Sequence, residues 1–325
     1  MSEVVTVAIP VRDGGAILEQ TLRMVRAQRL APPRALELVV CDSGSRDGSP
    51  QLARRFGAQV IEIAPERFSH GETRNLLMER SRGAHVAFLT QDAIPADDRW
   101  LSRLLSAFSL SEDVGLAFGP YRPRPDASPM VARELTQWFD SFSTTGRPRV
   151  DRLDPDERDL ESRALMGPRA YFTDANGCVA RSAWERFPFP DVPYAEDHAL
   201  ALKMLRGGYA KVYEPGAAVI HSHEYSAWGW LRRSFDESRA LHDVYGWVAP
   251  LEPRTMGLNL WGLVGADWRW MKAHRASDEG PAGAVSAIAR STVHHSAKLA
   301  GAALGSRSER LTPGLARRLS LERRR

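Results

Sequence analysis

The chain has 325 residues, a length that suits one sizeable α/β domain with an extension, and its 43% hydrophobic and 26% charged residues are ordinary for a globular protein. Its formal net charge is +4, and residues 301–325 alone hold seven arginines and two glutamates, so the rest of the chain is close to neutral. This distribution argues against a broad nucleic-acid-binding surface, and no nucleic-acid partner is expected.

Residues 1–11 contain neither a basic segment nor a long apolar stretch, which argues against a signal peptide. No window reaches the roughly 18 apolar residues that a membrane-spanning helix needs. The two cysteines, Cys41 and Cys178, each lie in an apolar run, so we expect reduced core residues and neither a disulfide nor a zinc site. These features predict a cytoplasmic protein.

Short β-rich segments alternate with helical patterns in the first 120 residues. One helix is predicted to begin at Ser49, with Pro50 in its first turn, and others are predicted at about 72–82 and after Asp97. The alternation predicts an α/β fold with a mostly parallel, doubly wound sheet. The predicted strands of this part are 4–9, 36–41, 59–63, 85–89 and 115–118.

Beyond residue 120 the pattern becomes less regular. A Pro-, Arg- and Asp-rich crossover at 121–170 contains one predicted helix near 131–142, and a core segment follows at 172–187. A further helix is predicted at 196–206, and short strands at 211–214 and 217–221. From residue 226 onward the chain reads as helical and rich in tryptophan.

Ligands of such sheets bind at the carboxyl ends of the strands, so the polar residues after each strand are the candidate site residues. A buried strand runs directly into Asp42, within residues 42–48 (DSGSRDG). A carboxylate there can accept hydrogen bonds from the N–H of uracil or thymine and from a ribose hydroxyl. A tight turn capped by an aspartate is the alternative interpretation.

Asp92 follows another buried strand, in residues 88–95 (FLTQDAIP). A carboxylate in this position can present itself to a divalent metal that bridges to a diphosphate and neutralises the charge of the leaving group. A helix-capping aspartate in a loop is the alternative.

Four short motifs occur in order along the chain: 8–13 (AIPVRD), 42–48 (DSGSRDG), 90–92 (TQD) and 196–197 (ED). Together they are similar to the successive motifs of family 2 glycosyltransferases of the GT-A fold, over roughly residues 4–225. Four motifs in the right order on strand ends carry more weight than any one of them. The segments 68–75 (FSHGETRN) and 221–226 (HSHEYS), together with 90–92, narrow the resemblance to bacterial rhamnosyltransferases.

The resemblance implies a role for each matching residue. By this resemblance the nucleobase of the donor contacts Asp42, and the Arg12-Asp13 turn lines the nucleotide pocket. Arg74 neutralises or positions the pyrophosphate. Gln91 belongs to the same nucleotide-sugar site. Asp92 matches the last aspartate of the DXD signature and implies Mg²⁺ or Mn²⁺ as cofactor. The first signature position is Thr90, which puts the strength of metal binding in doubt.

Glu196 and Asp197 open a predicted helix, where the helix dipole favours carboxylates. The functional interpretation is that one carboxylate removes the proton of the acceptor hydroxyl. The resemblance selects Asp197 as this base and leaves Glu196 to contact the acceptor. Asp174 and Asn176 are placed in the acceptor site from their position alone.

His221 and His223 lie two apart on an extended segment, so their side chains face the same side. That spacing suits joint contact with a metal or a diphosphate. A solvent-exposed pair is the alternative interpretation.

The C-terminal region has two interpretations. Its tryptophans pack in a core, or part of the region meets an anionic membrane together with Arg232, Arg233 and the basic tail. The second interpretation places the protein peripherally at the inner face of the cell membrane. A solvated, disordered tail is the alternative for residues 301–325.

The domain organisation follows from the resemblance. Residues 1–225 are expected to form the GT-A catalytic domain, with a nucleotide-sugar half at about 1–120 and an acceptor half at about 121–225. Residues 226–325 are expected to form a helical extension with a basic tail.

The expected reaction is inverting transfer of a sugar from a nucleoside diphosphate donor to a hydroxyl. The donor we expect is dTDP-L-rhamnose, and the acceptor is a cell-surface glycan or a lipid-linked precursor. A UDP or GDP donor of another hexose or N-acetylhexosamine is the alternative. A nucleotidyltransferase is disfavoured because the turn at 12–15 (RDGG) is too short and acidic for a triphosphate loop. An inactive sugar-binding module is disfavoured because Asp42, Asp92 and Asp197 are all present.

Overall fold

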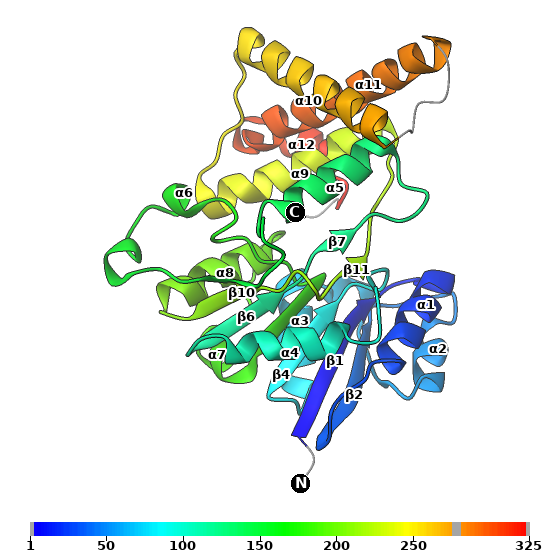
Figure 1. Ribbon diagram of the computed structural model, residues 1–325, viewed down its shortest axis with the longest axis vertical. Coiled ribbons are helices and arrows are strands. Elements are labelled where there is room, and N and C mark those ends of the chain that lie inside the picture. The colour runs from blue at the N-terminus through cyan, green and yellow to red at the C-terminus, as the bar shows by residue number, and fades with distance from the viewer. Residues whose placement is uncertain (1–2, 275–280, 323–325) are drawn as a thin grey trace. The chain divides into compact units, whose positions relative to one another are not determined.

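The computed structural model describes residues 3–274 and 281–322 (Figure 1). The strands are β1 (Glu3–Val11), β2 (Arg34–Asp42), β3 (Gln59–Glu62), β4 (His85–Leu89), β5 (Ile94–Pro95), β6 (Val114–Phe118), β7 (Tyr121–Arg122), β8 (Arg149–Asp151), β9 (Asn176–Ala180), β10 (Ala210–Tyr213) and β11 (Val219–Ile220). The helices are α1 (Gly15–Arg26), α2 (Ser49–Arg55), α3 (His70–Arg80), α4 (Trp100–Ser106), α5 (Pro129–Asp140), α6 (Ser162–Leu165), α7 (Arg181–Arg186), α8 (Glu196–Arg206), α9 (Ala227–Tyr245), α10 (Pro253–Ala273), α11 (Pro281–Gly305) and α12 (Pro313–Leu319).

The described residues form two compact units. The first comprises Met1–Arg122, Trp138–Val192 and Glu196–His221, and the second comprises Pro123–Gln137, Pro193–Ala195 and Ser222–Arg325. The division at His221 lies close to the end expected for the catalytic domain. The segment Pro123–Gln137 differs from the expectation, because it groups with the C-terminal helices.

The first unit is built on an 8-stranded sheet of order β3-β2-β1-β4-β9-β6-β10-β8. Strands β3, β2, β1 and β4 run parallel to one another, and β6 and β10 run parallel to each other. Strand β9 lies between β4 and β6 and runs antiparallel to both. The predicted α/β class with a mostly parallel sheet is confirmed. A second, 3-stranded sheet of order β5-β11-β7 lies in the same unit.

The first strand was predicted at 4–9, but β1 continues through Pro10 to Val11. Pairing with β4 covers only Val5 to Ala8, whereas pairing with β2 extends to Val11. At Pro10 the strand therefore has a partner on one side only, which is where a sheet tolerates a residue without an N–H.

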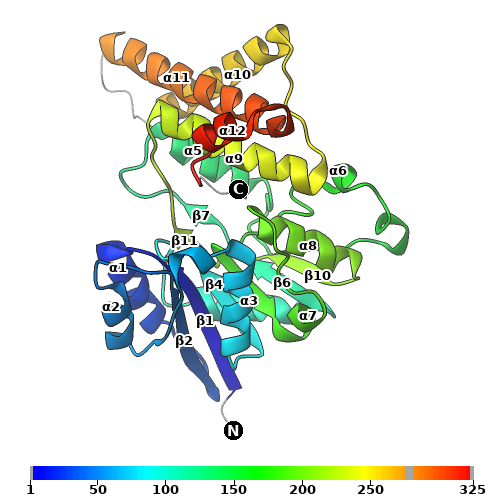
Figure 2. The ribbon, with the colours of Figure 1, turned by 180° about the vertical axis from the view of Figure 1, so that it is seen from behind.

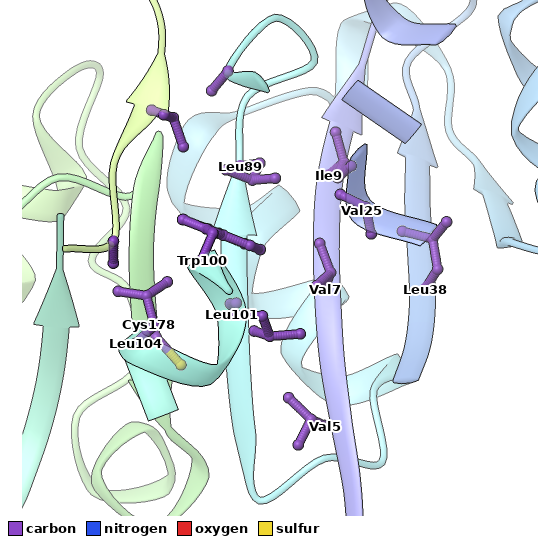
Figure 3. Close-up of a cluster of buried hydrophobic side chains, with 14 of the residues drawn as sticks. Val5, Val7, Ile9, Val25, Leu38, Leu89, Trp100, Leu101, Leu104 and Cys178 are labelled. Carbon is purple, nitrogen blue, oxygen red and sulfur yellow. The ribbon is translucent and has the colours of Figure 1, made fainter. Parts of the chain in front are cut away.

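The core of this unit lies between the sheet and its helices. Val5, Val7 and Ile9 alternate along β1 and point to one face of the sheet, where Trp100 of α4 is buried among them and their neighbours (Figure 3). On the other face α3 contacts β1 and β2, as Figure 2 shows from behind. Complete burial of such apolar side chains contributes roughly 1.5–3 kcal/mol each.

Both cysteines are free thiols inside this core, Cys41 on β2 and Cys178 on β9, as predicted. No helix in residues 3–274 and 281–322 combines the length and the apolar character that crossing a membrane requires.

The second unit is helical, as expected for the C-terminal region. Close packing of α9 on α11 depends on glycine, because a Cβ at Gly301 would lie 2.2 Å from the carbonyl oxygen of Leu231, and one at Gly305 would lie 2.1 Å from that of Phe235. The expectation that the tryptophans pack in a core is wrong for two of them, since Trp228 is 54% exposed and Trp261 is 81% exposed.

Candidate active site

The loops that follow β1 and β2 are joined to each other by hydrogen bonds. The Asp13 N–H donates to the Ser45 hydroxyl at 2.8 Å, and the Arg46 N–H donates to Asp13 Oδ1 at 2.7 Å. The Gly15 N–H donates to Asp47 Oδ2 at 2.7 Å. The predicted meeting of polar residues at the carboxyl ends of these two strands is therefore present.

Asp42 ends β2 and is almost completely buried. Its Oδ1 accepts hydrogen bonds from the N–H groups of Gly44 and Ser45 at 3.0 and 2.9 Å, and its Oδ2 accepts one from the Ser45 hydroxyl. The turn requires a glycine, since Gly44 has a φ of 85°. Asp42 thus holds the tight turn of the alternative interpretation, while its contact with a base stays a prediction.

Gln91 orients the turn after β1. Its Oε1 accepts from the Arg12 N–H at 2.8 Å, and its Nε2 donates to the Arg12 carbonyl at 3.0 Å. Both ends of the amide are engaged with the backbone, so Gln91 holds this turn, and its place in a nucleotide-sugar site stays a prediction. The side chains of Arg12 and Asp13 are exposed above it.

Asp92 and His221 are brought together by the small sheet. Strand β11 pairs with β5 so that Ile220 lies opposite Ile94, which places the residue after β11 next to the loop before β5. His221 Nδ1 is 3.5 Å from Asp92 Oδ1. The histidine is buried, with the Tyr121 ring edge-on to it at 5.0 Å, whereas Asp92 is half-buried.

An imidazole nitrogen and a carboxylate oxygen at this separation suit a divalent cation. His223 lies two residues beyond His221, at the start of the second unit, and its exposed ring stacks on Tyr225 at 5.7 Å. Two residues of chain span at most about 7 Å, so the backbone itself limits how far His223 lies from His221. The chemistry of Asp92 and His221 fits a metal, and the expected contact of His223 with it stays a prediction.

Arg74 differs from its expected role. It is buried in α3, where Nη2 donates to Asp174 Oδ1 at 2.6 Å, Nε lies against Asp174 Oδ2, and Nη1 is 3.0 Å from Glu196 Oε1. The side chains of all three residues are at most 5% exposed. A guanidinium this deep requires carboxylate partners, and it has two of them. Contact with a pyrophosphate is therefore not the function its surroundings support.

Glu196 and Asp174 are internal partners of Arg74 rather than surface groups. Glu196 also lies 3.8 Å from Nδ1 of His70, a residue that sequence reasoning did not select. The signal was available in the motif 68–75, where His70 precedes Arg74 by one helical turn.

The same motif fixes the chain before α8. The Asn75 side chain accepts hydrogen bonds from the Trp184 indole N–H at 2.8 Å and the Phe189 N–H at 2.9 Å, and it donates to the Phe189 carbonyl at 2.9 Å. A Cβ at Gly71 would lie 2.3 Å from the Pro190 carbonyl oxygen. This close approach positions the segment that leads to Glu196 and Asp197.

Asp197 lies in the first turn of α8, half-buried, and its Oδ1 accepts from the His198 N–H at 2.8 Å. Burial, and then the charge of Glu196, raise the pKa of Asp197 to about 7. Burial also raises the pKa of Asp174 to about 7 against the opposing effect of Arg74, and it raises the pKa of Glu196. Three carboxyl groups thus lie around one guanidinium, so they titrate as a coupled set.

Asn176 has a different place from the one expected. It is completely buried, with Oδ1 accepting from the Trp100 indole N–H at 2.7 Å and Nδ2 donating to the carbonyls of Pro120 and Ala217 at 3.2 and 2.9 Å. All of these partners are internal, so Asn176 ties the sheet to its neighbours. We therefore propose no contact of Asn176 with an acceptor.

The chain is similar to known proteins in both sequence and fold. Residues 6–160 match the sequence model of Glycosyl transferase family 2. The chain is 29% identical over 248 residues to the O-antigen chain rhamnosyltransferase RfbN of Salmonella typhimurium, covering 75% of this chain and 74% of that protein. It is 29% identical over 217 residues to the O-antigen chain rhamnosyltransferase WbaN of Salmonella anatum, covering 65% and 64%.

Among solved structures, the mannosyltransferase PcManGT from Pyrobaculum calidifontis, in complex with GDP-Man and Mn²⁺, superposes with a TM-score of 0.59. The superposition covers 93% of this chain and 86% of that one at 19% identity. At this identity the likeness shows the fold, which is GT-A as the resemblance implied.

Proposed function

We propose that this glycosyltransferase, whose residues 6–160 match Glycosyl transferase family 2, transfers L-rhamnose from dTDP-L-rhamnose to a hydroxyl of a cell-surface glycan or its lipid-linked precursor. The names of the two Salmonella relatives support the sugar and the class of acceptor. A hexose or N-acetylhexosamine from a UDP or GDP donor is the second candidate, and the GDP-Man bound to the Pyrobaculum structure favours keeping it. The match to this family removes the nucleotidyltransferase alternative.

The observation that carries the proposed mechanism is the state of Asp197. The neighbouring Glu196 forms an ion pair with Arg74, with Oε1 3.0 Å from Nη1. Burial raises the pKa of Asp197 to about 7. A general base works best when its pKa lies near the operating pH. We assign the base to Asp197, and we assign Glu196 and Asp174 to holding Arg74 and thereby setting that pKa.

The proposed step is a single displacement. The acceptor hydroxyl loses its proton to the Asp197 carboxylate while its oxygen attacks the anomeric carbon. The bond from that carbon to the diphosphate oxygen breaks, and the nucleoside diphosphate leaves with the electron pair. Attack from the side opposite the leaving group inverts the anomeric configuration.

Asp92 and His221 would hold a divalent metal, and the part of His223 in it stays a prediction. In such a site Mg²⁺ or Mn²⁺ would supply positive charge that offsets the negative charge of the diphosphate. The carboxylate of Asp92 is the anionic ligand of this set, so we expect it to contribute most to the affinity for a hard cation. Asp42 and the turn at Arg12 and Asp13 bind the nucleoside end.

The test of the proposed function is the release of nucleoside diphosphate from a panel of dTDP-, UDP- and GDP-sugars, with Mg²⁺, Mn²⁺ or excess chelator. We expect the fastest release from dTDP-L-rhamnose with metal, and none with chelator. Faster release from a UDP or GDP sugar would replace the proposed donor with the second candidate. Undiminished release in chelator would refute the metal assignment, and the absence of turnover of any donor would refute the function.

The preference for one nucleobase in the donor gives a separate prediction. Asp42→Asn keeps Oδ1 for the turn and replaces Oδ2 with an amide that cannot accept the N3–H of thymine or uracil. We expect dTDP and UDP to bind wild type better than ADP and CDP, and the variant to lose roughly 10–100-fold for dTDP, the value of one charged hydrogen bond. Isothermal titration calorimetry measures this, and equal affinities of wild type for all four nucleotides would remove the role from Asp42.

We also propose that the second unit contacts an anionic membrane, where a lipid-linked acceptor would lie. Trp228, Arg232, Arg317 and Arg318, with Gly314, line a surface cavity of about 470 Å³. Arg317 and Arg318 are exposed on α12, whose Leu319 is buried. The basic tail is described up to residue 322, and residues 323–325 lie outside the described part. Arg233 forms an ion pair with Glu237, with Nε 2.8 Å from Oε1.

Vesicle binding tests this contact. The double variant Arg317→Glu/Arg318→Glu should lose co-sedimentation with anionic vesicles at low salt, since each basic residue near the surface contributes about 1 kcal/mol. The matched control is Arg55→Glu/Arg80→Glu, two exposed arginines of the first unit with the same change in charge. Wild type should lose binding in high salt. Equal loss in both double variants would attribute the binding to net charge alone and refute this surface.

A further inference from the structure

A second group of metal-ligating side chains lies within the second unit. Glu134 comes from α5, and His294 and His295 are consecutive residues of α11. One ligand atom of each lies within 4.8 Å of the others. The two histidine side chains are 5% and 1% exposed, and Glu134 is 24% exposed. The proposed catalytic mechanism uses none of these residues.

The separations within this group resemble those between ligands of one metal. Glu134 Oε1 is 3.6 Å from His295 Nδ1, and Glu134 Oε2 is 3.5 Å from His294 Nε2. Hydrogen bonds of this kind are usually about 2.7–3.2 Å long. A tetrahedral zinc with bonds of about 2.0–2.1 Å holds its ligand atoms roughly 3.3–3.4 Å apart. The distance from Oε1 to His295 Nδ1 lies nearer to the second value, whereas Oε2 also pairs with Lys298.

The hydrogen bond of His295 orients its ring for a cation. Its Nε2 is 2.7 Å from Asp267 Oδ2, so this nitrogen faces a carboxylate to which it can donate. The other ring nitrogen, Nδ1, faces Glu134 Oε1. An imidazole nitrogen and a carboxylate oxygen that face each other can both bind one cation between them.

The groups behind these ligands are already in place. Asp267, which is completely buried, also accepts from the Ser291 hydroxyl at 2.5 Å and pairs with Arg133 Nε. Lys298 Nζ lies 2.6 Å from Glu134 Oε2, which leaves Oε1 directed at His295. Metal-binding histidines commonly donate their other N–H to a carboxylate, and metal-binding carboxylates commonly accept a hydrogen bond themselves. Both arrangements are present here.

We propose that Glu134, His294 and His295 bind one divalent transition metal of the zinc class, with water in the fourth position. Two imidazole nitrogens and one carboxylate oxygen favour Zn²⁺ over Mg²⁺ or Ca²⁺, which prefer oxygen ligands throughout. The ion links α5 to α11 and so stabilises the packing of the second unit. The site is separate in its ligands from the one that holds Asp92.

The test uses the full chain without a histidine tag, in an Asp92→Asn background that removes the carboxylate of the other metal site. After removal of bound metal, equilibrium dialysis against Zn²⁺ in excess Mg²⁺ measures stoichiometry and affinity. We expect one equivalent of Zn²⁺. Co²⁺ in its place should give the strong visible absorption of a four-coordinate site, and Zn²⁺ should raise the Tm.

Two variants and a control assign the ligands. His295→Gln keeps a side-chain N–H for Asp267 and removes the Nδ1 ligand, while His294→Asn removes the Nε2 ligand. Each should weaken Zn²⁺ binding by more than the roughly 10–100-fold caused by loss of an outer partner. His274→Ala should bind Zn²⁺ normally, because the His274 ring is exposed and pairs with the Trp270 carbonyl of its own helix.

The proposal is overturned if the Asp92→Asn chain binds no Zn²⁺, or if His295→Gln and His274→Ala bind it equally. In either case Glu134, His294 and His295 are not the ligands of one metal. Circular dichroism verifies the fold of each variant. Because His294 and His295 are tested separately, one folded ligand variant is sufficient to decide.

Discussion

Asp197→Asn is expected to lower kcat by roughly 10²–10⁴-fold while leaving the affinity for the donor unchanged, because the amide cannot take the proton of the acceptor hydroxyl. The two side chains have nearly the same shape, and the hydrogen bond from the His198 N–H to Oδ1 can be kept. Steady-state kinetics together with calorimetric titration of the donor separates the two effects.

Glu196→Gln is the control for this substitution. It removes one carboxylate from Arg74 but leaves Asp197 in place, so we expect the smaller loss of kcat. It also removes the negative charge that helps to raise the pKa of Asp197, so the pH optimum should move to lower pH. If Glu196→Gln proves the more damaging of the two, the base has been assigned to the wrong carboxylate.

Arg74→Met is expected to reduce the free energy of unfolding by about 3–5 kcal/mol at a pH above the raised pKa values of Asp174 and Glu196, the usual cost of leaving buried charges without their partner. Asp174 and Glu196 would both lose their contacts with the guanidinium. Urea denaturation followed by circular dichroism measures the change. The expected loss is several times larger than that of an exposed pair.

Arg23→Met is the matched control, since Arg23 pairs with Glu19 on the surface of α1 with a side chain that is 68% exposed. Exposed pairs of this kind contribute about 0.3–0.5 kcal/mol. The loss in Arg74→Met should shrink as the pH falls, because protonation removes the unpaired charges of Asp174 and Glu196. Equal losses in the two variants would show that the buried ion pairs do not stabilise the fold.

Much of the sheet and of the nucleotide loops could be predicted from the sequence. Apolar runs that end in Asp42 and Asp92 mark both the strands and the edge at which their ends meet. The periodic patterns likewise located α3 and α8 to within a few residues. These features are local, so a single sequence contains them.

The partners of buried charges could not be predicted in this way. Arg74 meets Asp174, which lies 100 residues further along the chain, and nothing in the sequence near either residue indicates the pairing. Asp267 and His295 occur in helical segments where polar residues ordinarily face solvent, yet both are buried. Folding brings such residues together, and only then does the low dielectric shift their pKa values.

The pH dependence of kcat/KM for donor turnover tests the central claim most directly, because the claim rests on a carboxyl group whose pKa burial raises to about 7. The base must be deprotonated to act, so activity should be full above this pKa and fall about tenfold per pH unit below it. The coupled carboxyl groups titrate together, so the observed value belongs to the set. The account predicts an acidic limb near pH 7 for wild type that moves to lower pH in Glu196→Gln. A kcat/KM that stays constant from pH 8 down to pH 5, as an ordinary aspartate would allow, would contradict it.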